Sequence, residues 1–172
     1  MFLKKEFRIF YLILFLTAIF LLFYFSLFDK KDFQSRTMVG KEIPNLKAQS
    51  LLKDEIVSIK NIVNDEVFIV NIFASWCAPC KIEHPFLVKL NQDKIKIIGI
   101  NYKDNRKNAQ KFLKKYKNPY HEILIDSDGE LSINLGAFGV PETFLVDRNF
   151  IIIDKKIGPI DDQFVKKASN FK

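Results

Sequence analysis

The chain has 172 residues, of which 48% are apolar and 27% charged, and its formal net charge is +7. This length suits one domain of about 140 residues once an N-terminal segment is set aside. The basic balance does not indicate a nucleic-acid-binding protein, because no basic patch is interleaved with exposed aromatic residues. The lysines are instead scattered over predicted helix faces, where a solvated surface explains them, as at Lys107, Lys111, Lys114 and Lys115.

Residues 9–28 form a run of twenty residues without a charge, rich in Phe and Leu. As a helix this run spans about 30 Å, the thickness of a bilayer core. It is longer than a usual signal-peptide core, and residues 26–29 offer no small-x-small cleavage pattern. We therefore expect an uncleaved transmembrane anchor, preceded by a short tail at residues 1–8 and followed by a polar juxtamembrane linker at residues 29–38.

The charges that flank this run do not decide its orientation in the membrane. Three basic residues precede the run and three follow it closely, so the positive-inside count is a tie. These residues are Lys4, Lys5, Arg8, Lys30, Lys31 and Arg36.

Residues 39–172 are expected to form one globular domain. Its first part predicts two short strands, at residues 45–48 and 55–59, that pair as a hairpin. Strands and helices then alternate, which is typical of a sheet with parallel strands covered by helices. The predicted order is strand 67–73, helix 78–92, strand 95–102, helix 106–116, strand 122–125, turn 126–129, a hairpin of strands 143–146 and 151–155, and a closing helix 161–171 whose N-cap is near Asp161.

Both cysteines of the chain stand in the run Trp76-Cys77-Ala78-Pro79-Cys80, where the strand 67–73 gives way to the helix 78–92. A helix N-terminus carries unpaired N–H groups and a partial positive charge, so it favours Cys77 as the thiolate that attacks disulfides. Cys80 lies one turn further along and can close a disulfide ring. Pro79 fits an early helical position, which has no intrahelical N–H bond to lose.

Other uses of this cysteine spacing are weaker. A zinc site needs four ligands, and only His84 and His121 can join the two cysteines unless carboxylates complete the set. A haem attachment motif requires histidine after the second cysteine, where this chain has Lys81. A structural disulfide stays open as an alternative, although a loop this small restrains the unfolded chain little.

Three further features resemble the thioredoxin superfamily. Pro85 lies five residues after Cys80, inside the predicted helix, where it is expected to produce a kink. The loop Gly139-Val140-Pro141 directly precedes the strand 143–146, as the cis-proline loop does in that superfamily, and Trp76 precedes the first cysteine. The resemblance implies a thioredoxin-like fold, an α/β fold with a mixed central sheet flanked by helices, in which Pro141 packs against the cysteines.

Within this superfamily the chain resembles the membrane-tethered thiol:disulfide interchange proteins of cytochrome c maturation, the DsbE or CcmG family. Several blocks carry the resemblance in the expected order: residues 39–41, 74–84, 99–104, 118–120 and 139–147. The family implies an enzyme anchored in the bacterial inner membrane, with its catalytic domain in the periplasm. It would keep the haem-binding cysteines of apocytochrome c reduced, take electrons from a membrane thiol protein, and need no metal or organic cofactor.

The resemblance also assigns acidic residues to the site. Ordinary thioredoxin has a buried Asp six residues before the first cysteine, where this chain has Asn71, which cannot act as a base. The maturation family would place Glu83 and Glu142 near the disulfide instead, where a carboxylate disfavours a thiolate. The alternative is that Glu83 is a solvated helix residue and Glu142 a loop residue. His84 is expected at the surface.

Two other functions stay open. One is a general extracytoplasmic thiol:disulfide reductase, which differs in its substrate range. The other is an anchored thioredoxin-like binding or chaperone module whose disulfide is only structural. The reduction potential, which decides the direction of electron flow, depends on tens of millivolts and does not follow from the sequence.

Overall fold

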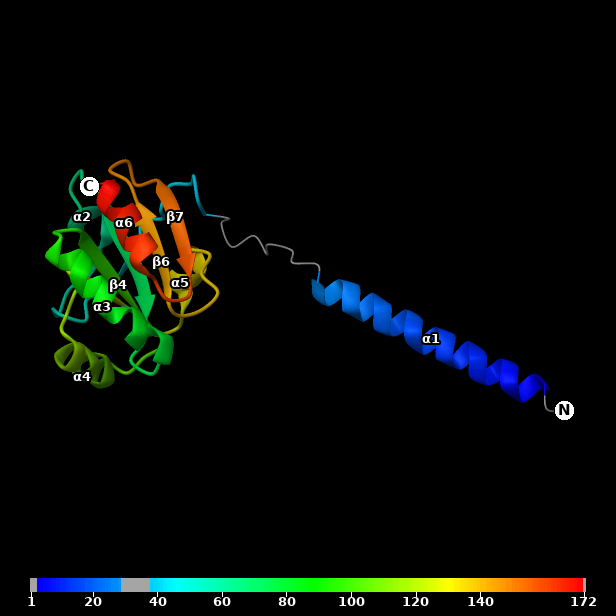
Figure 1. Cartoon of the computed structure of the whole chain (residues 1–172). Coiled ribbons are helices and arrows are strands. Elements are labelled where there is room, and N and C mark those ends of the chain that lie inside the picture. The colour runs from blue at the N-terminus through cyan, green and yellow to red at the C-terminus, as the bar shows by residue number, and fades with distance from the viewer. Residues whose placement is uncertain (1–2, 29–37, 172) are drawn as a thin grey trace. The chain divides into compact units, whose positions relative to one another are not determined.

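The computed structural model of the protein describes residues 3–28 and 38–171. The chain divides into two compact units, Met1–Ser35 and Arg36–Lys172, which are described separately (Figure 1). Nearly all of the predicted linker, residues 29–37, lies outside the described residues.

The first unit is built on one helix, α1 (Leu3–Phe28), which contains the predicted run 9–28. Within it, Phe7–Phe25 has a mean hydropathy of 2.2, and its side chains are not buried by the protein. Among the described residues this is the one helix long and apolar enough to cross a membrane. The helix expected from the sequence is therefore present.

The second unit is built on a five-stranded mixed sheet with the order β5-β4-β3-β6-β7. The central strand β3 is parallel to β4 and antiparallel to β6, β5 is parallel to β4, and β7 is antiparallel to β6. The sheet is therefore mixed, as the resemblance implied. Its strands are β3 (Phe68–Phe73), β4 (Lys96–Tyr102), β5 (Glu122–Asp126), β6 (Glu142–Val146) and β7 (Ile152–Ile157).

Layers on both faces of the sheet bury β3 along its whole length. Alternate residues of the strand point to opposite faces. Ile69 and Phe73 belong to the apolar cluster with α3 (Ala78–Gln92), α4 (Arg106–Tyr116) and α6 (Asp162–Asn170). Asn71 lies between Ile69 and Phe73 in sequence, so its side chain points to the same face.

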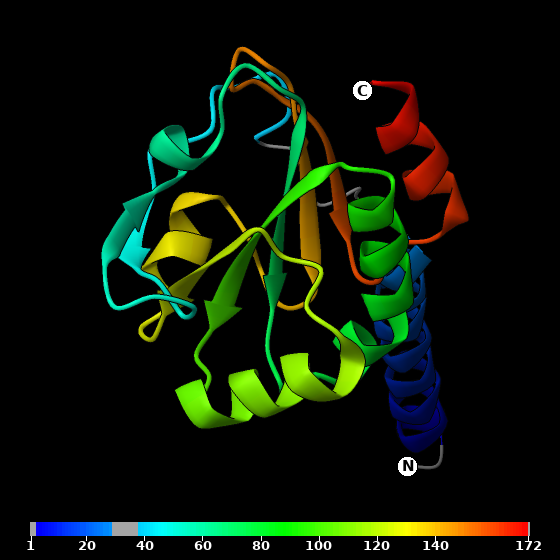
Figure 2. The ribbon, with the colours of Figure 1, turned by 90° about the vertical axis from the view of Figure 1, so that its left-hand side faces the viewer.

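The opposite face of the sheet is covered by smaller elements. Phe68, Val70 and Ile72 of β3 pack there with residues 43–63 and with the region of α5 (Glu130–Asn134). This layer includes the hairpin of β1 (Lys47–Gln49) and β2 (Ile56–Ser58), and α2 (Ile59–Ile62). Figure 2 shows α3 and α6 on one side of the sheet and the hairpin with α5 on the other.

The predicted elements are all present, with bounds that differ by a few residues. Helices 78–92 and 106–116 match α3 and α4, and the closing helix begins after its N-cap, Asp161, which accepts a hydrogen bond from the Phe164 N–H. Two short helices, α2 and α5, were not predicted from the sequence; they have four and five residues. Helices this short do not establish a hydrophobic period of their own.

Candidate active site

Cys77 and Cys80 form a disulfide at the N-terminus of α3, beyond the carboxyl end of β3. Cys77 is the N-cap residue of the helix, and its Sγ accepts a hydrogen bond of 3.1 Å from the Cys80 N–H. Pro79 occupies the first helical turn as predicted, and Pro85 lies inside the helix. The helix N-terminus therefore directs an N–H group at the Cys77 sulfur, which favours its negative charge after reduction.

The loop before the disulfide is fixed by the residues that follow β4. The Asp104 carboxylate accepts hydrogen bonds from the Ser75 N–H, at 2.6 Å, and from the Ser75 hydroxyl, at 2.8 Å. The Trp76 indole N–H donates to the Lys103 carbonyl at 3.1 Å, while 56% of the Trp76 surface stays exposed. Asp104 lies in one of the blocks that carry the resemblance, but its role did not follow from the sequence; its hydrogen bonds with Ser75 explain why an acid stands there.

The loop with Pro141 lies next to the carboxyl end of β3. Antiparallel pairing sets Glu142 opposite Ile72, so the residue before Glu142 adjoins the segment that leads to Cys77. The Val140–Pro141 peptide bond is cis, as the resemblance implied. Val140 packs against the apolar cluster that contains both cysteines.

Glu142 is a buried strand residue, not a solvated loop residue, and its charge is balanced by a lysine. One oxygen accepts hydrogen bonds from the N–H groups of Phe138, at 2.6 Å, and Gly139, at 3.0 Å. The other oxygen lies 2.9 Å from Nζ of Lys155, and both side chains are almost fully buried. Lys155 also donates to the Gly136 carbonyl at 2.8 Å. The pair thus fastens the loop 136–141 to β6 and β7.

The burial of Lys155 was not predicted, because strand alternation does not place this residue inside. β7 carries one extra residue relative to β6, since Leu145 pairs with Asp154 but Val146 pairs with Ile152. A bulge of this kind changes which side chains share a face. Ile152 and Lys155 are both buried although their spacing is odd.

Glu83 is fully buried on the same face of α3 as Cys80. One carboxylate oxygen accepts a hydrogen bond of 2.9 Å from the Asn71 amide, and the other accepts one of 3.0 Å from the Ile160 N–H. Burial raises the pKa of Glu83 to about 7, although both hydrogen bonds act in the opposite direction. The solvated-helix reading of Glu83 is therefore wrong.

Asn71 connects Glu83 to two further side chains. Its amide nitrogen also donates to the Thr143 hydroxyl at 2.9 Å, and its amide oxygen accepts from the Tyr120 hydroxyl at 2.8 Å. Burial and the nearby Glu83 charge raise the pKa of Tyr120 well above its ordinary value. The position that holds an acid in thioredoxin thus carries an amide that orients an acid on the neighbouring helix.

His84 is buried, and its expected surface position is wrong. Its Nε2 lies 2.7 Å from the Lys117 carbonyl, which assigns the proton to that nitrogen. The ring packs edge-on against Phe112 of α4, and burial lowers its pKa. The helical spacing contained this information, because residues 83 and 84 follow Cys80 by three and four positions on the stripe that continues to Leu87.

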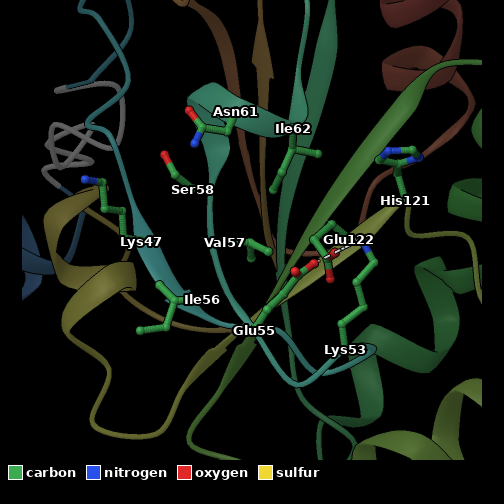
Figure 3. Close-up of a pocket in the computed structure, with 10 residues that line it drawn as sticks. All are labelled: Lys47, Lys53, Glu55, Ile56, Val57, Ser58, Asn61, Ile62, His121 and Glu122. Carbon is green, nitrogen blue, oxygen red and sulfur yellow. Dashed lines mark ion pairs between the residues drawn. The ribbon is translucent and has the colours of Figure 1, made fainter.

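A cavity of about 740 Å³ lies between the β1–β2 hairpin, α2 and the start of β5 (Figure 3). None of the site residues predicted from the sequence lines it. Of the two lysines that line it, Lys53 forms ion pairs of 3.3 Å with Glu55 and 3.6 Å with Glu122. The same Glu122 accepts a hydrogen bond of 2.7 Å from the Ser50 hydroxyl. We assign this cavity no part in the chemistry of the disulfide.

Comparison with known proteins places this site in a family. Residues 38–171 match the family model described as Redoxin. The thiol:disulfide interchange protein DsbE of Pseudomonas fluorescens is 39% identical over 134 residues, which cover 78% of this chain and 74% of that protein. A probable thiol:disulfide interchange protein DsbE-2 of Pasteurella multocida is 34% identical over 157 residues, 91% of this chain and 83% of its own length.

A solved structure agrees with the fold. The DsbF homologue of Corynebacterium diphtheriae superposes with a TM-score of 0.67 at 24% identity, over 76% of this chain and 85% of that one. At this identity the likeness shows the thioredoxin-like fold alone.

The raised pKa of Glu83 predicts a pH dependence of stability. Between pH 4.5 and about 7, the carboxyl group of Glu83 is protonated in the native state and ionised in the unfolded chain. The contribution of Glu83 to the free energy of unfolding is therefore complete below pH 4.5, falls by about 3 kcal/mol up to pH 7, and is constant above. Urea unfolding of the oxidised protein from pH 4 to 8 measures it.

In this experiment the difference in the free energy of unfolding between the wild type and Glu83→Gln reports the ionisation of Glu83 alone, because His84 titrates in both proteins. The difference should change with pH between 4.5 and 7. The exposed Glu130 provides a control, and Glu130→Gln should leave the wild-type profile intact. Parallel profiles for the wild type and Glu83→Gln would show that Glu83 has an ordinary pKa.

The buried pair predicts a large cost for removing one partner. Lys155→Met leaves the Glu142 carboxylate buried without its counter-ion, and we expect a loss of about 3–5 kcal/mol in the free energy of unfolding. The double variant Glu142→Gln/Lys155→Met should recover part of this loss, because no buried charge remains. Equal stability of the single and double variants in urea would mean that the pair is not coupled.

Proposed function

The chain belongs to the redoxin family, among the DsbE-type thiol:disulfide interchange proteins, and we propose that it is the dithiol reductant that keeps the haem-binding cysteines of apocytochrome c reduced. The observation that carries this proposal is the Cys77–Cys80 disulfide at the N-terminus of α3. A disulfide in this position is the oxidised product of a cysteine pair that has donated two electrons.

The proposed reaction begins with the reduced pair. The Cys77 thiolate, stabilised by the helix N-terminus, attacks a sulfur of the substrate disulfide and forms a mixed disulfide, while the other substrate sulfur leaves as a thiolate. Cys80 then attacks Cys77. This step forms the Cys77–Cys80 disulfide and releases the substrate as a dithiol. Two electrons pass to the substrate, and a membrane thiol protein must return two electrons to the pair.

Glu83 is suited to accept the proton that Cys80 loses when it attacks. The two residues are three positions apart on α3, and side chains at this spacing are neighbours. A general base works best with a pKa near the ambient pH, and burial raises the pKa of Glu83 to about 7. Asn71, which has no acid–base chemistry of its own, holds the carboxyl group in place.

Trp76, Pro141 and Glu142 serve the same reaction by shaping the site. Trp76 is exposed next to Cys77, where a partner can pack on it. The loop with Pro141 can align a substrate segment by main-chain hydrogen bonds, much as an added strand is bound. Glu142 acts through this loop, because its carboxylate holds the N–H groups of Phe138 and Gly139.

The proposed order of events predicts which variant traps a substrate. Cys80→Ser keeps the nucleophile but lacks the resolving thiol, so mixed disulfides through Cys77 should accumulate. They should appear on non-reducing gels, and Cys77→Ser, the matched control, should abolish most of them. Mass spectrometry should identify few partners, chiefly apocytochrome c or its maturation proteins and the membrane electron donor.

Two results of the trapping experiment contradict the proposal. Many unrelated partners would indicate a general extracytoplasmic reductase. The absence of any adduct would indicate that the disulfide is structural, in a binding or chaperone module.

We also propose that residues 9–28 anchor the protein in the inner membrane of a bacterium, with residues 39–172 in the periplasm. The support is the apolar helix Phe7–Phe25 and the redox pair, since disulfide exchange with exported proteins takes place outside the cytosol. Residues 29–38 would then connect the anchor to the catalytic domain.

The anchor predicts that the full-length chain stays with membranes after extraction with alkaline carbonate. A chain without residues 1–31 should be soluble, because both apolar clusters lie beyond them. A reporter fused after Lys172 should be active only in the periplasm. Carbonate release of the full-length chain, or a cytosolic reporter signal, would contradict the membrane placement.

A further inference from the structure

A groove of about 360 Å³ lies beside the disulfide loop, between the start of α3 and α4. It is distinct from the loop that contains Pro141. Figure 2 shows α4 crossing the end of the sheet at which α3 begins. The groove is lined by Ser75, Trp76, Lys81, Asn108, Lys111, Phe112, Lys115 and Tyr116.

Within the described residues, the cations of this groove have no acidic partner. Lys81, Lys111 and Lys115 are exposed, and none of them is in an ion pair within the described part of the chain. Residues 105–121 contain six basic residues and no Asp or Glu. Asp104, which bonds to Ser75 at the groove, is already engaged by N–H and O–H donors.

Three aromatic side chains, Trp76, Phe112 and Tyr116, line the groove together with the lysines. Phe112 and Tyr116 pack against each other with ring centroids 5.0 Å apart, and Trp76 is half-exposed above the disulfide loop. The exposed cations stand next to aromatic rings in a shallow groove that includes Trp76, the residue before Cys77, whereas the sequence indicated an evenly solvated helix face. The position beside the nucleophile favours a segment of the protein that Cys77 attacks over a lipid surface.

We propose that this groove binds an acidic segment of the protein whose disulfide is reduced at Cys77. The inference rests on the proposed disulfide exchange, since it assigns the chemistry of the partner in that reaction. Charge complementarity between the three lysines and carboxylates of the partner accelerates the encounter and selects among partners. The interaction weakens with salt, because the lysines are exposed.

The test uses the full-length chain in neutral detergent and two sets of synthetic peptides. Every peptide has a core based on Cys-x-x-Cys-His, and within each set this core is flanked by three glutamates, three glutamines or three lysines. In the first set serines replace both cysteines of the core, so that only binding is measured. Trp76 is the single tryptophan of the chain and lines the groove, so its fluorescence reports binding. In the second set the cysteines form a disulfide, and its reduction rate by the reduced protein is measured.

We expect the glutamate peptides to bind and to be reduced about tenfold better than the lysine peptides at low salt, with the glutamine peptides between them. Lys111→Gln/Lys115→Gln should remove this preference. Lys107→Gln/Lys114→Gln is the matched control, because it removes the same charge from α4 at positions that do not line the groove. The control should keep most of the preference.

The groove assignment fails if the glutamate and glutamine peptides bind equally. It also fails if the two double variants lose the preference equally. The preference would then come from the overall positive charge of the protein and not from the groove. Equal quenching of Trp76 by a single-stranded oligonucleotide, or by an anionic lipid mixed into the detergent micelles, would indicate a non-specific polyanion surface and overturn the assignment. Binding of glutamate peptides without reduction of any disulfide peptide would instead leave the groove in place and contradict the proposed reductase function.

Discussion

A buried carboxyl group, Glu83, holds together the elements that meet beneath the disulfide. It accepts hydrogen bonds from β3, through Asn71, and from the Ile160 N–H in the segment before α6. Asn71 in turn connects to Thr143 of β6 and to Tyr120 before β5. A buried polar group is tolerated only when its partners are satisfied, so this network constrains the spacing of α3, β3 and β6. Burial raises the pKa of the same carboxyl group to about 7, which suits the proton transfer that we propose for it.

The acidic residues around the disulfide are paired, hydrogen-bonded or protonated, so they do not give the site an exposed negative charge. Glu142 is balanced by Lys155, the oxygens of Asp104 are held by Ser75 and its neighbours, and Glu83 carries a proton below about pH 7. The lysines that line the groove have no such acidic partners in the described residues. The charged groups that stay exposed next to Trp76 are therefore the lysines of the groove, whereas Glu83, Asp104 and Glu142 have hydrogen-bond or ion-pair partners of their own.

Two separate sets of contacts hold the loops on either side of the disulfide. On one side the Glu142–Lys155 pair fastens the loop with Pro141 to β6 and β7. On the other side Asp104 fixes Ser75, and the Trp76 indole is bonded to the Lys103 carbonyl. In both sets of contacts a buried or half-buried charge lies at the end of a strand, where backbone N–H groups lack sheet partners. The loops on both sides of the cysteines are thus held by hydrogen bonds and an ion pair, while the surfaces that flank the cysteines differ in chemistry.

The sequence by itself determined the local features of this protein. The uncharged run 9–28, the strand before Trp76, the helix N-terminus at Cys77 and the Gly139-Val140-Pro141 loop follow from patterns of a few neighbouring residues. The resemblance to thioredoxin-like reductases, and with it the mixed sheet, rests on those same blocks. The stripe of Cys80, Leu87 and Leu90 on α3 also indicated the burial of Glu83 and His84, although His84 was expected at the surface and a solvated position stayed open for Glu83.

Only the tertiary structure decided the partners of these groups. Lys155 reaches Glu142 because a bulge in β7 turns it inward, and no alternation pattern shows such a shift. The groove exists because α4 packs next to the start of α3, which places Lys111 and Lys115 beside Trp76 across more than thirty residues of sequence. Periodicity tells which residues share a face of one element. Burial, ion pairing and pKa depend on which other element covers that face, and this is settled only when the chain is packed.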